Sequence, residues 1–205
     1  MFEAIVTAVS SFILGVISYS GYWGIFILMV VESANIPAPS EIIMTFSGFL
    51  ASSGELNFWA VVSVATFANF IGSILSYWLA RYYGREGINF LIKILILDDD
   101  DVVLAEKWFN RFGLTSSFIG RLLPIVRTFI SLPAGLFKVN LWKFSILTLL
   151  GSFIWCLTLT SAGYLAGENW ETVEPYFRAF DGVIVVVAVV IISWLVYRRL
   201  HKVLK

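Results

Sequence analysis

The segment VESANIPAPSE, residues 31–41, decides how this sequence folds. It carries two glutamates and two prolines, and it follows a run without any charged residue, residues 4–31. A second apolar stretch begins directly after Glu41. Proline breaks a helix because it lacks a backbone donor and clashes with the preceding turn. The segment therefore predicts an interrupted helix whose acidic side chains lie in an apolar part of the fold.

The composition indicates an α-helical membrane protein. Hydrophobic residues make up 59% of the 205 residues and charged residues only 14%, unlike the composition of soluble domains. Charge is also absent over residues 56–80, 144–167 and 182–197. A membrane-spanning helix needs about 20 apolar residues, so the first two runs qualify directly. The third qualifies if Arg198 and Arg199 extend towards the membrane surface. We expect about three full transmembrane helices and, because the runs do not alternate, no transmembrane strands.

Charged residues between the spans set the expected topology. Arginines follow the first span, lysines precede the second, and the chain ends in RRLHKVLK, whereas residues 168–174 are acidic. The positive-inside rule places residues 81–143 and the C-terminus in the cytoplasm. This requires the proline-containing segment 112–137 to enter and leave the membrane on one side. The segment is therefore predicted to be a re-entrant hairpin, which needs protein or water around it.

Residues 22–54 are expected to form a second hairpin that enters from the opposite side. The two halves of the chain also share a spacing: NFW at 57–59 precedes Gly84 by the same interval as NLW at 140–142 precedes Gly167. Inverted repeats with interrupted helices are typical of transporters.

The predicted fold is an all-α polytopic membrane protein, an inverted repeat with two opposed re-entrant helical hairpins. It is a single membrane domain, residues 1–205, with repeats at 1–84 and 98–167 and a C-terminal transmembrane helix and basic tail at 179–205. The expected hairpin breaks are Pro37, Pro39, Pro124, Pro133 and Gly135.

The two hairpins carry opposite charges. The first contributes Glu32 and Glu41, and the second contributes Arg121 and Arg127. An ionisable group costs about 2.5–3.5 kcal/mol at the centre of a membrane helix, so four such groups are expected to share a polar cavity. Arginine binds phosphate bidentately, so the arginines are candidate ligands of a lipid headgroup. The glutamates are candidates for proton coupling. Static ion pairs, Glu32–Arg121 or Glu41–Arg127, are the alternative.

The remaining features predict structure rather than chemistry. Residues 98–111 form an amphipathic pattern that favours an interfacial helix, and residues 4–20 favour a helix whose relation to the membrane stays open. Cys156 lies within a span and is expected to pack there. We expect no metal or cofactor, because the single histidine, His201, lies in the tail, and no nucleic-acid partner, because the net charge is zero. The start MFEAIV lacks the features of a signal peptide, so no cleavage is expected.

The sequence resembles the DedA family, also called the VTT or SNARE-associated Golgi family. The resemblance rests on ESANIPAPSE, on FIGRLLPIVR at 118–127 followed by PAG at 133–135, and on SAGYLAG. It implies a bacterial cytoplasmic-membrane protein with two re-entrant hairpins that translocates lipids, chiefly undecaprenyl phosphate, with phospholipid scrambling ascribed to relatives. It also implies that Glu32, Glu41, Arg121 and Arg127 occupy essential positions. Ala80 departs from the usual glycine, and relatives often carry an acid near Asn69 or Ser73, which is missing here.

We therefore predict a transporter, not an enzyme, that moves a polyprenyl phosphate from the outer to the inner leaflet. Arg121 and Arg127 would hold the phosphate while Glu32 and Glu41 couple the movement to protons. The alternatives are a phospholipid scramblase or proton-driven ion exchanger and, as an enzyme, a polyprenyl-diphosphate phosphatase.

Overall fold

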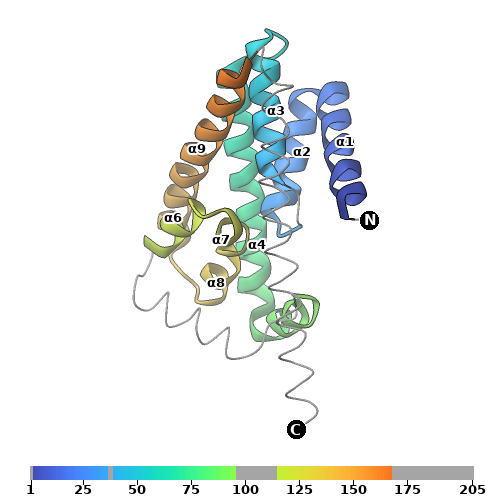
Figure 1. The fold of residues 1–205 in the computed structure, drawn as a ribbon. Helices are drawn as coiled ribbons and strands as arrows, with labels where there is room; N and C mark the ends of the chain where they lie inside the picture. Colours follow the sequence, from blue (N-terminus) through green and yellow to red (C-terminus); the bar gives the residue numbers. More distant parts are fainter. Residues whose placement is uncertain (1, 37–38, 96–114, 168–205) are drawn as a thin grey trace.

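The computed structural model describes residues 2–36, 39–95 and 115–167, and regular structure within these ranges is entirely helical (Figure 1). The helices are α1 (Phe2–Ser20), α2 (Tyr22–Ser33), α3 (Ser40–Ser52), α4 (Phe58–Leu95), α6 (Thr115–Arg121), α7 (Pro124–Phe129), α8 (Ser131–Leu136) and α9 (Leu141–Ala166). The predicted C-terminal transmembrane helix and the interfacial helix at 98–111 lie outside the described residues. The helix expected over residues 4–20 is present as α1.

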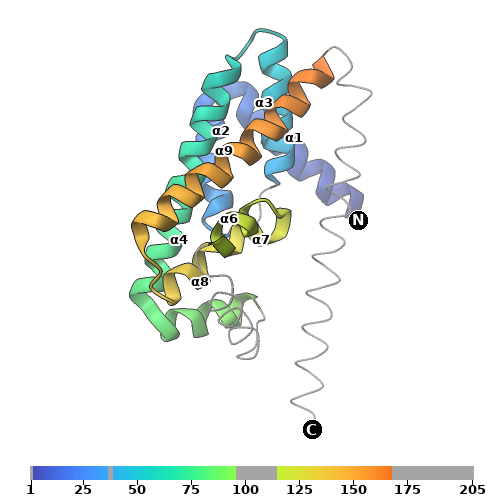
Figure 2. The same cartoon turned by 90° about the vertical axis from the view of Figure 1, so that its left-hand side faces the viewer.

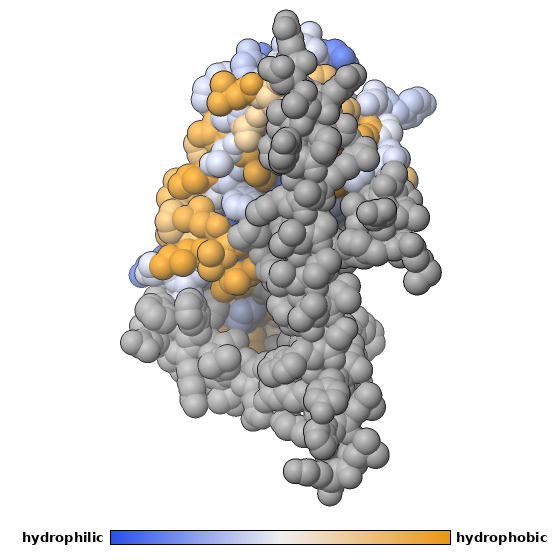
Figure 3. All heavy atoms as spheres, in the orientation of Figure 1, coloured by the Kyte–Doolittle hydropathy of each residue, from blue (hydrophilic) through white to orange (hydrophobic). Residues whose placement is uncertain are grey.

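Among the described residues, two helices are long and apolar enough to cross a membrane: the Phe58–Gly84 part of α4, with 27 residues, and α9, with 26. The spans predicted at residues 56–80 and 144–167 are therefore confirmed as continuous helices, whereas the third predicted span lies outside the described residues. Apolar side chains gather along the flank of the molecule on which α9 lies (Figure 3). The exposed residues of α9 include Leu149, Leu150, Phe153 and Ile154.

The two long helices begin and end alike. The Asn57 side-chain oxygen accepts from the Ala60 N–H at 3.0 Å, and the Asn140 oxygen accepts from the Lys143 N–H at 3.1 Å, so each asparagine caps the start of its helix. The helical course breaks at Gly84 (φ 51°) in α4 and ends before Gly167 (φ 37°) in α9, a backbone conformation that favours glycine. These are the positions at which the sequence shows its repeated spacing.

The chain is interrupted between α2 and α3, as the opening segment predicts. Asn35 has a φ of 69°, a conformation that asparagine tolerates and that ends the helix after Ser33. Pro39 then precedes the first residue of α3. The second expected break, Pro37, lies outside the described residues. As a result α2 and α3 are separate helices that lie beside each other (Figure 1).

The second proline-containing segment forms three short helices, α6, α7 and α8 (Figure 2). α6 packs against α9, α8 packs against α4, and α7 lies against α2. Pro124 is the first residue of α7, where its missing N–H costs nothing. Pro133 and Gly135 both lie inside α8. Gly135 faces the Tyr77 carbonyl of α4 so closely that a Cβ atom there would overlap it. α8 can therefore lie directly on α4.

Close backbone contact also joins α3 to α9. A Cβ atom on Gly163 would overlap the Thr45 carbonyl, and one on Gly48 would overlap the Thr160 carbonyl. Small residues at such crossings are the usual means of helix association in membranes. Together with α4, this packing brings the ends of α2 and α3 next to α7.

Candidate functional site

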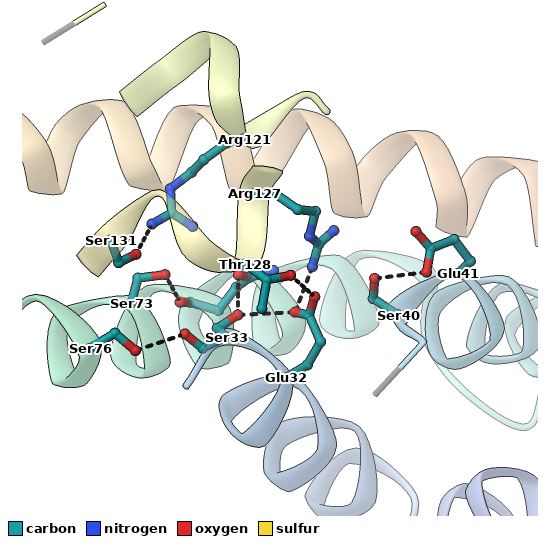
Figure 4. Close-up of polar contacts among 11 residues, drawn as sticks. Glu32, Ser33, Ser40, Glu41, Ser73, Ser76, Arg121, Arg127, Thr128 and Ser131 are labelled. Atoms are coloured by element: carbon teal, nitrogen blue, oxygen red, sulfur yellow. Dashed lines mark hydrogen bonds and ion pairs between the residues drawn. The ribbon is translucent and has the colours of Figure 1, made fainter. Parts of the chain in front are cut away.

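The site lies where the interruption between α2 and α3 meets the short helices α6 to α8 (Figure 4). All four ionisable residues singled out in the sequence are buried: Glu32 is 4% exposed, Glu41 7%, Arg121 2% and Arg127 4%. Glu32 lies in the last turn of α2 and Glu41 in the first turn of α3. Arg121 ends α6 and Arg127 lies in α7. The fold thus collects four ionisable residues from four helices into the interior.

Glu32 and Arg127 form an ion pair. Arg127 Nη2 donates to Glu32 Oε2 at 2.7 Å, and the Thr128 hydroxyl donates to the other carboxylate oxygen, Oε1, at 3.1 Å. Two consecutive residues of α7 therefore hold both oxygens of a carboxylate that lies 95 residues earlier in the chain. This contact ties the acidic interruption to the basic segment.

This pairing differs from both static pairs considered from the sequence. The structure joins Glu32 to Arg127, whereas the sequence suggested Glu32–Arg121 or Glu41–Arg127. The reason is the position of α7, which places Arg127 and Thr128 together against the end of α2. Those two expectations were wrong, although one acid and one base do pair.

Arg121 is held by neutral groups. Its Nε donates to the Thr148 hydroxyl of α9 at 3.2 Å, and Nη2 donates to the Ser131 hydroxyl of α8 at 2.8 Å. The guanidinium carbon lies 5.7 Å from the centre of the Phe144 ring. Across the described ranges, no carboxylate oxygen lies within 4 Å of an Arg121 guanidinium nitrogen. Within residues 2–36, 39–95 and 115–167, Arg121 is therefore a buried cation that no direct ion pair neutralises.

Glu41 is similarly without an ion pair in the described part of the chain. Its Oε2 lies 3.4 Å from the Ser40 hydroxyl, at the outer limit of a hydrogen bond. In Figure 4, Glu32 lies directly below the Arg127 guanidinium, and Glu41 lies to the right of it. The site thus contains one ion pair, one cation and one carboxyl group.

A hydroxyl and amide network on α4 supports Glu32. The Ser33 hydroxyl lies 3.2 Å from Glu32 Oε2 and is also hydrogen-bonded to the side-chain oxygen of Asn69. Ser76 Oγ donates to the Ser33 carbonyl at 3.2 Å, and Asn35 Nδ2 donates to Ser76 Oγ at 2.6 Å. These contacts fix the end of α2 against α4. Asn69 thus supplies a neutral amide to this network.

Sequence reasoning missed most of the residues that contact the buried charges. Ser33 and Thr128 contact Glu32, Ser131 and Thr148 contact Arg121, and the Trp155 ring lies beneath Arg127. Single hydroxyls are common in membrane helices, so none of them is conspicuous alone. A usable signal is their spacing on α9, where Thr148, Ser152 and Trp155 recur at helical intervals on one face.

The described residues contain no group of three or more His, Cys, Asp or Glu side chains that could hold a metal ion. Cys156 is fully buried in the main hydrophobic core, which confirms the packing role expected for it. The four ionisable residues of the site offer charge-based chemistry, because guanidinium groups can bind an anion and carboxyl groups can exchange protons.

The sequence matches the family described as VTT domain over residues 37–165. It is 35% identical over 184 residues to an "Alkaline phosphatase-like protein" of Lactococcus lactis subsp. cremoris, with 87% of this chain and 86% of the relative covered. It is 31% identical to "Undecaprenyl phosphate transporter A" of Bacillus subtilis, covering 84% and 85%. It is 30% identical to the protein of that name in Staphylococcus aureus, covering 91% and 94%. No solved structure matches.

Proposed function

The chain belongs to the VTT-domain family of membrane proteins, also called the DedA family, and on this premise we propose that it transports a lipid phosphate across the bacterial cytoplasmic membrane. The lipid class we propose is a polyprenyl phosphate such as undecaprenyl phosphate. The proposed direction is from the outer to the inner leaflet, which returns the carrier for another round of cell-envelope synthesis. Two relatives that carry the name of such a transporter support this choice.

The observation that carries the proposal is the state of Arg121. It is 2% exposed, bonded only to hydroxyl groups in the described structure and without a carboxylate within 4 Å. A buried cation is costly unless an anion accompanies it during function. A phosphate monoester bound between Arg121 and Arg127 would supply that anion and accept two bidentate sets of hydrogen bonds.

The ion pair of Arg127 suggests how protons would be coupled to phosphate binding. The Glu32 carboxylate is paired with the Arg127 guanidinium at 2.7 Å. A bound phosphate would therefore compete with this carboxylate for the same guanidinium. Protonation of Glu32 removes that competition, and Glu41 in the next helix is the second group able to carry a proton. In this scheme a proton binds as the phosphate binds, and both leave together.

We further propose that residues 22–54 and 112–137 are re-entrant hairpins that enter from opposite membrane faces, with the C-terminus in the cytoplasm. The matched asparagine caps and glycine ends of α4 and α9 support the underlying repeat. So do the interruptions before Ser40 and at Pro124. A site between two such hairpins would lie near the middle of the membrane, where transporters of this kind bind their substrates.

The main competing function is phosphate hydrolysis, because relatives from Lactococcus lactis are named alkaline phosphatase-like. The same arginines would then bind a phosphate, and Ser131, 2.8 Å from Arg121, would be the nearest hydroxyl nucleophile. A serine nucleophile needs a base beside it. The candidate carboxylate, Glu32, is already held by Arg127 and Thr128. Phospholipid scrambling without proton coupling is the other competitor.

The deciding experiment is reconstitution of the purified protein in liposomes. Leaflet-resolved assays would follow undecaprenyl phosphate and labelled phospholipids, and a colorimetric assay would follow phosphate released from undecaprenyl diphosphate. We expect undecaprenyl phosphate to move faster than the phospholipids, with a rate that rises when a pH gradient is imposed. We expect the gradient to raise the rate of the Glu41→Gln variant less than that of the wild type, because this variant lacks the second proton-carrying group.

Each competing function predicts a different result in this experiment. Equal rates for all lipids would indicate a scramblase, and stoichiometric release of phosphate would indicate an enzyme. Failure of the wild-type protein to move any lipid above the rate in empty liposomes would contradict the proposal.

A further inference from the structure

Trp155 lies beside Arg127 and carries a hydrogen-bond donor that no described residue accepts. The Arg127 guanidinium carbon lies 4.9 Å from the centre of the Trp155 ring, a distance typical of a cation–π interaction. The indole Nε1 is buried and has no hydrogen-bond partner among the described residues. A buried indole N–H usually has a partner, so the open donor needs an explanation.

The position of Trp155 does not fit the role that tryptophan commonly has at the membrane interface. Tryptophan is enriched at membrane interfaces, where the ring contacts lipid and the N–H contacts water. Trp142, which is 74% exposed at the start of α9, fits that description. Trp155 lies at the middle of the same helix and faces inward on Arg127. An interfacial role therefore does not account for it.

The face of α9 that carries Trp155 is the face that lines both arginines. One and two turns earlier, Gly151 lies against the Arg121 side chain and Thr148 accepts from Arg121 Nε. The buried Ser152 hydroxyl on this part of the helix also has no hydrogen-bond partner in the part of the chain that the structure describes. Free donors thus occur on α9 where the proposed phosphate would bind.

We propose that Trp155 is a third ligand of the lipid phosphate: its Nε1–H donates to a phosphate oxygen while its ring holds the Arg127 guanidinium. The ring contact keeps Arg127 in place when phosphate displaces Glu32, and the N–H adds a neutral donor to the two cations. The chemical class recognised is a lipid phosphate monoester. This inference rests on the proposed binding of phosphate at Arg121 and Arg127.

Two substitutions at Trp155 distinguish the contribution of the indole N–H from that of the aromatic ring. Trp155→Phe keeps an aromatic face for Arg127 and removes the donor, and Trp155→Leu removes both. Losing one hydrogen bond to a charged group reduces affinity roughly tenfold or more. We expect Trp155→Phe to raise the half-saturating fraction of undecaprenyl phosphate by about that factor with the maximal rate nearly unchanged, and Trp155→Leu to lower the maximal rate as well. Trp142→Phe, on the exposed end of α9, is the matched control and should behave as the wild type.

A spectroscopic measurement tests the contact without requiring transport. In protein labelled with ¹⁵N-tryptophan, the indole signal that is missing from Trp155→Phe belongs to Trp155. Undecaprenyl phosphate should shift this signal downfield, whereas undecaprenol, which has the same chain but no phosphate, should not. A merely structural tryptophan would respond equally to both lipids or to neither, and that result would overturn the inference. A phosphate-dependent shift in protein that transports nothing would support the contact and contradict the proposed function instead.

Discussion

The two buried arginines differ in what neutralises them. Arg127 pairs with a carboxylate at 2.7 Å, and the same carboxylate is held by Thr128. Arg121 lies six residues earlier and is equally buried, but its described partners are two hydroxyls and the face of Phe144. One guanidinium therefore completes a structural contact between distant segments. The other is held in place with its charge still available.

This difference predicts that one arginine contributes mainly to stability and the other mainly to ligand binding. Breaking a buried ion pair leaves an uncompensated charge, whereas removing an unpaired buried charge removes a desolvation cost. Arg127 should therefore matter to the folded state, and Arg121 should matter mainly to the ligand. Substitutions at the two positions can test this directly.

The largest expected effect is that of Arg127→Ala on stability. The change leaves the Glu32 carboxylate buried, at 4% exposure, without its cation. Breaking a buried ion pair in this way typically costs about 3–5 kcal/mol. We expect the free energy of unfolding in detergent, measured by denaturant titration, to fall by that amount. The double variant Glu32→Gln/Arg127→Gln removes both charges and should recover most of the loss. A double variant as unstable as Arg127→Ala would show that the pair itself is not what stabilises the fold.

Arg121→Met should have a much smaller effect on stability. Methionine keeps most of the side-chain volume and removes the buried charge, and the freed hydroxyls of Ser131 and Thr148 can turn to carbonyls of their own helices. We expect the free energy of unfolding to change by less than about 1 kcal/mol. A loss as large as that of Arg127→Ala would mean that Arg121 is also a structural residue.

Effects on stability of about the same size are expected from a matched pair of threonine substitutions. Thr128→Val removes a hydrogen bond to Glu32, and Thr148→Val removes one from Arg121. Each should lower the free energy of unfolding by about 0.5–1.5 kcal/mol. Only Thr148→Val should also weaken binding of undecaprenyl phosphate, because it loosens the guanidinium that faces the ligand. Equal effects of the two variants on binding would remove the distinction between the arginines.

The sequence predicts the larger elements well because they follow from composition and local chemistry. The charge-free runs before Arg81 and after Lys143 became α4 and α9. The segment before Glu41 became an interruption, since Asn35 and Pro39 act on their own backbone. That buried acids meet buried bases follows from the cost of isolated charge, and the ion pair confirms it in part.

The choice of partners could not be predicted because it depends on how distant helices meet. Glu32 pairs with Arg127 rather than Arg121 because α7 presents Arg127 and Thr128 together. This orientation depends on α8, which in turn lies against α4 only because Gly135 has no side chain. The donors around Arg121 and the ring beneath Arg127 come from α8 and α9. Hydrophobic periodicity carries no information about such contacts.

The central claim is that Arg121 provides the charge that binds the lipid phosphate, and one transport assay tests it most directly. Wild-type protein, Arg121→Lys and Arg121→Met would be reconstituted at equal amounts after their folding is verified in detergent. We predict that Arg121→Met moves undecaprenyl phosphate no faster than empty liposomes, and that Arg121→Lys retains a reduced rate because it keeps the charge without the bidentate geometry. Transport by folded Arg121→Met at the wild-type rate would contradict the claim.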